Sequence, residues 1–226
     1  MTNILEVEDL TKIFVIAKNA NLIAVNNVSF SLKRGETLGL VGESGSGKTT
    51  VGRCILRLIE PTEGRVILDG NDITKLDAKH LRDLRANMQL VFQDPFGSLN
   101  PRLTVSQTVE EPLKLHGMGR GERPERVAEM MGLVGLDQYF YHYYPADLTA
   151  SEQQRVGIAR AIAIKPVYLF YDDGIEIKNN SNENILDIYQ NAPGSRLYII
   201  DGELENLTIN FNGYKINQND NELNLK

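Results

Sequence analysis

Cysteine and histidine are scarce in this chain of 226 residues, and each scarcity excludes a kind of site. The single cysteine, Cys54, allows no disulfide framework, which is typical of proteins in a reducing cytosol. We expect it to be a packing residue and not a nucleophile. The histidines at positions 80, 116 and 142 have no metal-ligand spacing, so we expect all three at the surface.

Membrane-spanning, secretory and nucleic-acid-binding features are also missing. No apolar run approaches about 18 residues, the length that a transmembrane helix needs. Residues 1–6 lack a basic segment followed by an apolar core, so we expect no signal peptide. The net charge of −6 argues against nucleic acid as the main partner, because a phosphate backbone needs broad positive charge. With 42% hydrophobic residues, the chain is predicted to form one sizeable domain.

The segment Gly42–Thr50 matches G-x-x-x-x-G-K-[ST], the phosphate-binding loop. The apolar run Thr37–Val41 before it predicts a buried strand, and Thr50–Ile59 after it has the apolar spacing of a helix. Glycines let such a loop turn tightly and direct its N–H groups inward, and the start of the helix adds its positive dipole end. The candidate nucleotide-binding residues here are Gly42, Glu43, Ser44, Gly45, Ser46, Gly47, Lys48, Thr49 and Thr50.

Two side chains of this loop have specific expected roles. Lys48 would reach the β- and γ-phosphates, and the Thr49 hydroxyl would bind Mg²⁺. The alternative is a chance glycine-rich turn, which the regular flanking segments disfavour.

Polar side chains at the ends of two apolar runs complete the predicted magnesium site. The run Val167–Tyr171 has the composition of a central parallel strand, and it ends in Asp172 and Asp173. Downstream of a phosphate loop, Asp172 would order Mg²⁺ and Asp173 would polarise the attacking water. Gln93 follows the apolar run Met88–Phe92 and is placed to meet a metal or a water. The alternative for Asp172 and Asp173 is an acidic turn at the end of a strand. The alternative for Gln93 is a solvated turn residue.

Three alternating segments predict an antiparallel β layer beside the loop: 4–10, 24–32 and 64–70. Phe14 is expected in the loop between the first two strands, where it either stacks on adenine or is a half-buried loop aromatic. Residues 104–144 are predicted to be helical, as is Ser151–Ile164. The aromatic cluster 139–144 suggests a surface patch, although packing under the next helix is the favoured interpretation.

After Asp173 the loops become rich in asparagine. A short helix is predicted over 185–189, a strand over 196–200, and a hairpin with an Asn-Gly turn over 207–216. We interpret this part as a continued domain with unusual surfaces. A shifted reading frame or a fusion is the alternative.

The order of phosphate loop, Gln93, an arginine-bearing helix and Asp172 resembles that of ABC-transporter ATPases. The amino-acid sequences of residues 24–48 and 91–102 resemble those of the ATP-binding subunits of oligopeptide and dipeptide importers. The resemblance implies an α/β fold: a P-loop NTPase core with an antiparallel β subdomain and a helical subdomain. We expect one nucleotide-binding domain over 1–226. Its parts would be the β subdomain and RecA-like core (1–103 and 150–226), the helical subdomain (104–149) and a divergent tail (174–226).

The resemblance further implies ATP and Mg²⁺ as cofactors and a function in peptide import. Phe14 would stack on adenine, Val25 would also contact the nucleotide, and Gln93 would sense the γ-phosphate. The catalytic set would be Lys48, Gln93 and Asp173, and the metal set Thr49, Gln93 and Asp172. Implied partners are an integral membrane permease, docked on residues 104–144, and a second ATP-binding subunit in a head-to-tail dimer. The chain would then lie at the cytoplasmic face of the membrane.

Departures from the family pattern affect the parts that close over the nucleotide and hydrolyse it. The signature motif aligns with Leu148–Glu152, where Ala150 and Ser151 replace glycines and Glu152 puts a negative charge near a phosphate. Asp173 is one methylene shorter than the family's glutamate, and Asp201 replaces the switch histidine. We therefore predict Mg-ATP binding with slow or no hydrolysis. The alternatives are an active transport ATPase, a non-hydrolysing regulatory partner, and an altered product with no physiological role.

Overall fold

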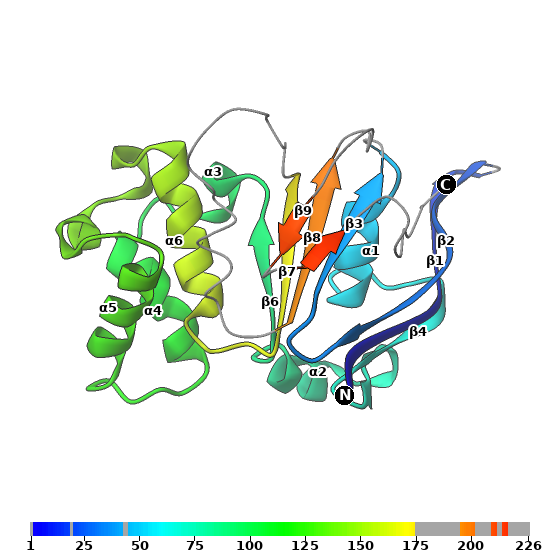
Figure 1. Cartoon of the computed structure of the whole chain (residues 1–226), viewed down its shortest axis with the longest axis horizontal. Helices are drawn as coiled ribbons and strands as arrows, with labels where there is room; N and C mark the ends of the chain where they lie inside the picture. The colour runs from blue at the N-terminus through cyan, green and yellow to red at the C-terminus, as the bar shows by residue number, and fades with distance from the viewer. Residues whose placement is uncertain are drawn as a thin grey trace. The chain divides into compact units, whose positions relative to one another are not determined.

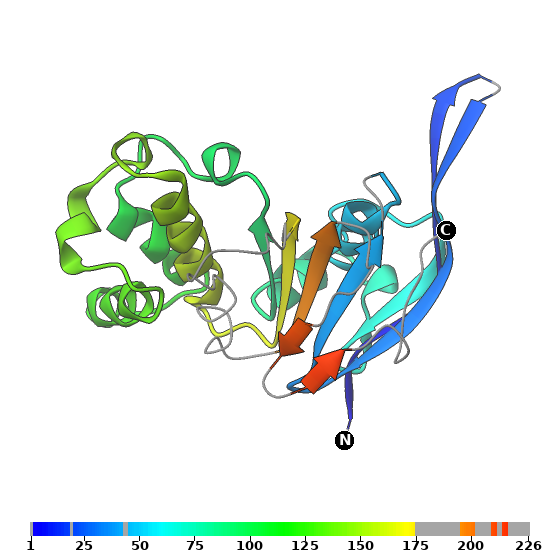
Figure 2. The same ribbon diagram turned by 45° about the horizontal axis from the view of Figure 1, so that its top comes forward.

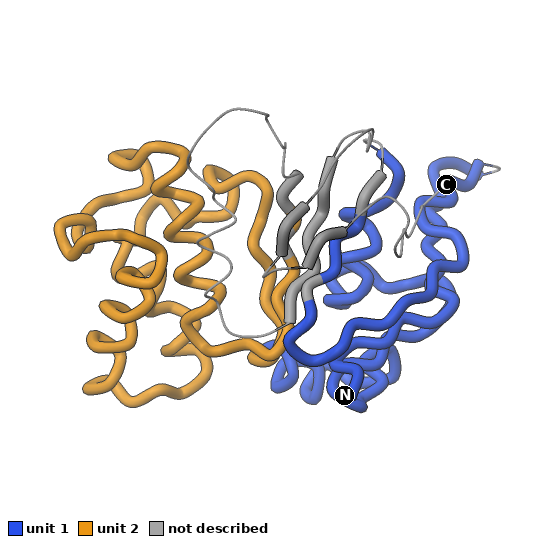
Figure 3. The backbone as a smooth tube through the Cα atoms, viewed as in Figure 1, with its two compact units in different colours: residues 1–85, 174–178, 195–226 blue, residues 86–173, 179–194 orange. Residues whose placement is uncertain are grey.

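The computed structural model describes residues 2–18, 20–42, 45–174, 195–201, 209–211 and 214–216 (Figure 1). The chain divides into two compact units (Figure 3). The first comprises residues 1–85, 174–178 and 195–226, and the second comprises residues 86–173 and 179–194. The subdomain limits expected from the sequence stay a prediction.

The first unit contains an antiparallel sheet with strand order β2-β1-β4-β5. Its strands are β1 (Asn3–Ala17), β2 (Ala20–Lys33), β4 (Glu63–Leu68) and β5 (Asn71–Asp72). The alternating pattern holds at Leu5 and Val7, which lie almost fully buried in the core, and a register shift at Asp9 (φ of 50°) then brings Leu10 back to the core. The three expected strands are confirmed.

The first two strands are longer than predicted. The last β1–β4 pair joins Thr11 to Glu63, and β1 and β2 then continue together as a two-stranded ribbon (Figure 2). Phe14 therefore lies within β1, opposite Leu22, and the prediction that it lies in a loop was wrong. The run of β-branched and aromatic residues around it favours strand over loop.

A parallel strand pair leads into the loop of the first unit. β3 (Thr37–Gly42) pairs with β8 (Ser195–Asp201), from Thr37 opposite Arg196 to Gly42 opposite Asp201. The helix α1 (Lys48–Ile55) follows β3 after a short connection. Both predicted strands and the helix start near Lys48 are confirmed. The helix ends before Ile59 because Arg57 adopts a left-handed conformation, with φ of 49°.

The remaining elements of the first unit are short. They are η1 (Ile73–Lys75), α2 (Ala78–Leu84), β9 (Ile209–Phe211) and β10 (Tyr214–Ile216). β9 and β10 pair antiparallel, so the predicted hairpin strands are confirmed. Its Asn-Gly turn and the helix predicted over 185–189 lie outside the described residues.

The second unit combines a parallel strand pair with helices. The strands β6 (Met88–Phe92) and β7 (Tyr168–Gly174) pair in parallel. The helical elements are α3 (Pro95–Ser98), α4 (Val105–Leu115), α5 (Arg123–Leu133), η2 (Gln138–His142), η3 (Pro145–Asp147) and α6 (Ala150–Ile162). Tyr168, Leu169 and Phe170 have no exposed surface, which confirms the prediction of a buried central strand. No helix in the described part of the chain is long and apolar enough to cross a bilayer.

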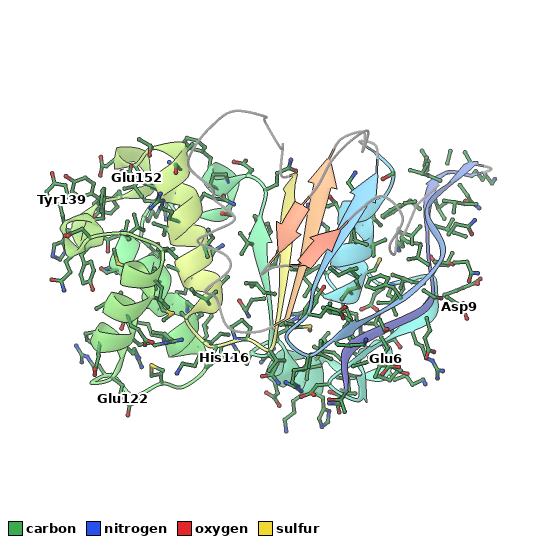
Figure 4. All side chains as sticks on the ribbon, viewed as in Figure 1. Glu6, Asp9, His116, Glu122, Tyr139 and Glu152 are labelled. Carbon is green, nitrogen blue, oxygen red and sulfur yellow. The ribbon has the colours of Figure 1, made fainter. Side chains whose placement is uncertain are left out.

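The aromatic cluster lies partly at the surface. Tyr139 is 68% exposed and Tyr144 47% exposed, and Tyr139 is visible at the edge of the helical region (Figure 4). Tyr139, Phe140 and Tyr143 contact one another, with ring centroids 5.0–5.6 Å apart. The favoured interpretation of packing was therefore wrong for Tyr139 and Tyr144, whereas the hydroxyl of Tyr141 is buried. The rings bury one another partly, which lets the cluster stay at the surface.

Arg126 fastens α5 to the end of α6. Its side chain is only 8% exposed, and its guanidinium donates to the carbonyl oxygens of Ala163 (2.7 Å) and Ile162 (3.2 Å). These acceptors lie at the C-terminal end of α6, where carbonyls have no partner within the helix. A third contact goes to Glu129, whose carboxylate is half exposed.

We predict that Arg126→Met lowers the free energy of unfolding by about 2–3 kcal/mol, because it leaves buried carbonyls without a charged donor. Urea denaturation measures this change. Glu129→Gln is the matched control, and its cost should stay below about 1 kcal/mol, as for an exposed ion pair. Equal effects of the two substitutions would contradict the assignment.

Candidate functional site

The connection from β3 to α1 forms a turn built on two glycines in left-handed conformations. Gly45 has φ of 83°, and Gly47, the residue that precedes α1, has φ of 96°. Side chains other than glycine adopt this region at a steric cost. Glu43 and Ser44 lie outside the described residues. The strand, loop and helix order that the motif requires is thus present.

The strand β2 lies directly against the loop at Gly47. A Cβ atom at this position would overlap the carbonyl oxygen of Ala24 and lie 3.8 Å from Val25 Cγ2. Val25 itself is only 4% exposed. Val25 therefore packs against the loop at Gly47. Its expected contact with a nucleotide stays a prediction.

The loop and the start of α1 fit an anion. The Ser46 hydroxyl is buried without a hydrogen-bond partner among the described residues, although buried polar groups almost always have one. No side chain caps α1, and its first turn has no acidic residue. Lys48 is almost fully buried there, at 4% exposure, and Thr49 and Thr50 follow on the same turn. A phosphate group would accept a hydrogen bond from the Ser46 hydroxyl. Its negative charge would also interact favourably with the positive end of the α1 dipole.

A second group of polar side chains lies at the carboxyl ends of β6 and β7. Phe92 pairs with Asp172, and Gln93 is the next residue of its chain, so the structure brings Gln93 and Asp172 to the same edge. Asp172 is 3% exposed and Gln93 is exposed. Asp173 continues β7 by its backbone, and its side chain lies outside what is described.

The donor set suits magnesium better than most metals. No group of three or more His, Cys, Asp or Glu side chains gathers within the described residues. Mg²⁺ is commonly held by one or two carboxylates, with waters and substrate phosphates as the other ligands. Within the second unit, one carboxylate (Asp172) and one amide (Gln93) at the same edge fit part of such a ligand set. The structure places Thr49 in the first unit and the other two in the second, so their joint action is a proposal.

The start of α6 carries the altered signature motif, and here the structure adds a contact that the sequence reasoning missed. Thr149 caps the helix, and Glu152 accepts from the Thr149 N–H (2.7 Å) and from its hydroxyl (2.8 Å). These hydrogen bonds lower the pKa of Glu152. Glu152 is thus held as the acid of a capping box (Figure 4). The sequence pattern Thr-x-x-Glu at residues 149–152 is typical of a capping box and could have predicted this contact.

Other expected residues lie as follows. Phe14 is half-buried on the ribbon, with the Lys12 ammonium 5.0 Å from the ring centroid, and its contact with adenine stays a prediction. Asp201 lies opposite Gly42, so its backbone is at the entrance of the loop. Cys54 is fully buried, and burial raises its pKa to about 11, which confirms a packing role. The three histidines are exposed, as predicted.

A parallel strand, a glycine turn and an uncapped helix that fits phosphate define a P-loop nucleotide-binding protein. The sequence profile of the family described as ABC transporter matches residues 25–176. The chain belongs to this family.

Several relatives are similar over most of the chain. The oligopeptide transport ATP-binding protein AppF of Bacillus subtilis is 46% identical over 76% of this chain and 55% of its own length. A putative peptide import ATP-binding protein of Brucella ovis is 39% identical over 90% of this chain and 65% of its own length. The chain thus spans about three fifths of the length of these curated relatives.

Solved structures confirm the fold class. The ATP-binding cassette MJ0796, in a dimeric post-hydrolysis state bound to ADP and Pi, matches with a TM-score of 0.77 and 29% identity, over 88% of each chain. The cbiO1 protein of Clostridium perfringens, part of the ABC transporter complex cbiONQ, matches with a TM-score of 0.72 at 21% identity, over 89% of this chain and 80% of its own. The predicted α/β ABC ATPase fold is therefore correct.

We predict that Gly47→Ala abolishes ATP binding and destabilises the fold, because the added methyl overlaps the Ala24 carbonyl. Gly70→Ala is the matched control, since Gly70 also has positive φ (79°) but open space around its Cβ position. The control should cost on the order of 1 kcal/mol and leave ATP binding intact. Isothermal titration and urea denaturation measure the two effects. Normal ATP binding by Gly47→Ala would contradict the close approach of β2.

Proposed function

We propose that this chain is the ATP-binding subunit of an ABC transporter and couples ATP to peptide import through a membrane permease. The observation that carries the proposal is the loop itself: a buried, unpartnered Ser46 hydroxyl beside an uncapped helix start, at the place where the motif expects phosphate. The names of the relatives in Bacillus and Brucella support the peptide-import part.

The expected work of each residue follows from its position. The backbone of the loop and Lys48 would hold the phosphates, and Thr49, Gln93 and Asp172 would hold Mg²⁺. The metal neutralises charge on the β- and γ-phosphates when it is bound. Asp173 would be the base that accepts the proton of the attacking water. Its side chain is one methylene shorter than the family's glutamate, so its carboxylate would lie farther from that water.

We infer that hydrolysis is impaired, which leaves a non-hydrolysing regulatory subunit as the second candidate function. The capping box favours this candidate, because Glu152 is ionised at the start of α6, where the family places a γ-phosphate of the partner subunit. The side chains of Ala150 and Ser151 add bulk on the same turn. In this second function the chain binds Mg-ATP and pairs with an intact subunit.

The proposed partners are a permease and a second ATP-binding subunit, at the cytoplasmic face of the membrane. The helical segment 104–144 of the second unit is the proposed permease contact. The exposed rings of Tyr139 and Tyr144 lie in it, and aromatic side chains are enriched at protein interfaces.

ATP binding by the purified chain tests the proposal. We predict that Lys48→Ala weakens Mg-ATP binding by about tenfold or more, the effect of losing a hydrogen bond from a charged group. Lys79→Ala, an exposed lysine on α2, is the control and should bind as the native chain does. No binding of the native chain at millimolar ATP would overturn the whole proposal.

Restoring the family pattern tests the impaired-hydrolysis part. We predict that Ala150→Gly, Ser151→Gly, Glu152→Gln and Asp173→Glu together raise ATP turnover by about tenfold or more, since they supply close approach and a base that reaches the water. Phosphate release is the measurement. The same four substitutions combined with Lys48→Ala should stay inactive. Turnover by the native chain that equals that of the restored variant would exclude impairment.

A further inference from the structure

Two arginines of α6 donate to backbone carbonyls of other segments, and one of these segments contains Gln93. Arg160 Nη1 donates to the carbonyl oxygen of Ser98 at 2.7 Å, and Arg155 Nη1 donates to that of Val134 at 3.2 Å. Ser98 is the last residue of α3, which begins two residues after Gln93. Both are hydrogen bonds from a guanidinium to a backbone carbonyl, but only the Arg160 bond goes to the segment that contains Gln93.

The segment from Gln93 to Leu99 is tied at both ends. At its start, Gln93 follows β6, whose last residue pairs with Asp172 of β7. Within it, Asp94 accepts from the Phe96 N–H (2.9 Å) and thereby caps α3. At its end, Leu99 is 4% exposed and the Ser98 carbonyl receives the Arg160 guanidinium. The Gln93 side chain between these ties is exposed.

The Arg160 bond is the stronger kind of tie. Its guanidinium is half-buried, and burial lowers its pKa while Glu111 opposes that effect. A short hydrogen bond from a charged donor in such surroundings is roughly twice as strong as a neutral one. It joins residues 62 positions apart in the chain. The end of the Gln93 segment is therefore anchored on α6.

We propose that Arg160 is a positioning residue for Gln93: it holds the end of the 93–99 segment on α6 so that the Gln93 amide stays at the edge where Asp172 lies. The inference rests on the proposed function, because Mg²⁺ is the group that Gln93 would meet there. It also connects the two ends of α6, since the same helix starts with the altered signature turn at Thr149–Glu152.

Hydrogen exchange of the nucleotide-free chain tests the structural step. Arg160→Met keeps the aliphatic stem and should lower the protection of the backbone amides in the 94–99 segment, where only Pro95 has none, by about tenfold, the lower limit for losing a charged hydrogen bond. Arg155→Met is the matched control and should leave these amides unchanged while exposing those that follow Val134. Compared with Arg160→Met, Arg160→Lys keeps the positive charge and N–H donors on a single ammonium, so it should restore part of the protection. Unchanged protection of 94–99 in Arg160→Met would overturn the proposal.

The Mg²⁺ dependence of ATP binding tests the positioning step. ATP affinity is measured with magnesium and with EDTA in the native chain, Arg160→Met, Arg155→Met and Gln93→Ala. Arg160→Met should lose the increase in ATP affinity that magnesium gives, as Gln93→Ala does, while its ATP affinity in EDTA stays unchanged. The double variant Gln93→Ala with Arg160→Met should lose no more of this increase than either single variant. Equal losses with magnesium and with EDTA, or a loss shared by Arg155→Met, would overturn the positioning role. If the native chain binds no ATP at all, the proposed function fails, whereas the exchange result still stands on its own.

Discussion

The close approach of β2 to Gly47 is the contact on which the candidate site depends. The Ala24 carbonyl lies where any larger residue would place its Cβ, so the loop can pass over β2 only with glycine at this position. That passage puts Val25 beneath the loop and starts α1 at Lys48 without a capping side chain. The shape of the proposed phosphate site thus depends on one steric constraint between a sheet and a turn.

The helix α6 has a comparable role in the second unit. Its first turn is closed by Thr149 and Glu152, its last turn reaches the Gln93 segment through Arg160, and the carbonyls at its C-terminal end accept from Arg126. All three ties involve charged side chains bonded to backbone groups or to a capping residue.

The sequence predicted the strands and helices well where the hydrophobic period was regular. β6 agrees with its prediction at both ends, and the strand of residues 168–170 is fully buried as its apolar run indicated. The predictions failed at Phe14, where cross-strand pairing with Leu22 extends β1, and at the aromatic cluster, where rings cover one another at the surface. Both failures concern contacts with residues that a local pattern does not contain.

The sequence alone determined the order of the chemical groups: the phosphate loop, Gln93, the altered signature and Asp172. It could do so because each of these is a local pattern whose turn chemistry or period is set by neighbouring residues. Only the tertiary structure decided which groups meet. The parallel register that brings Gln93 beside Asp172, the engagement of Glu152 in a cap, and the bond from Arg160 to Ser98 depend on packing. Such contacts form when distant elements bury a common core, and no local pattern specifies them.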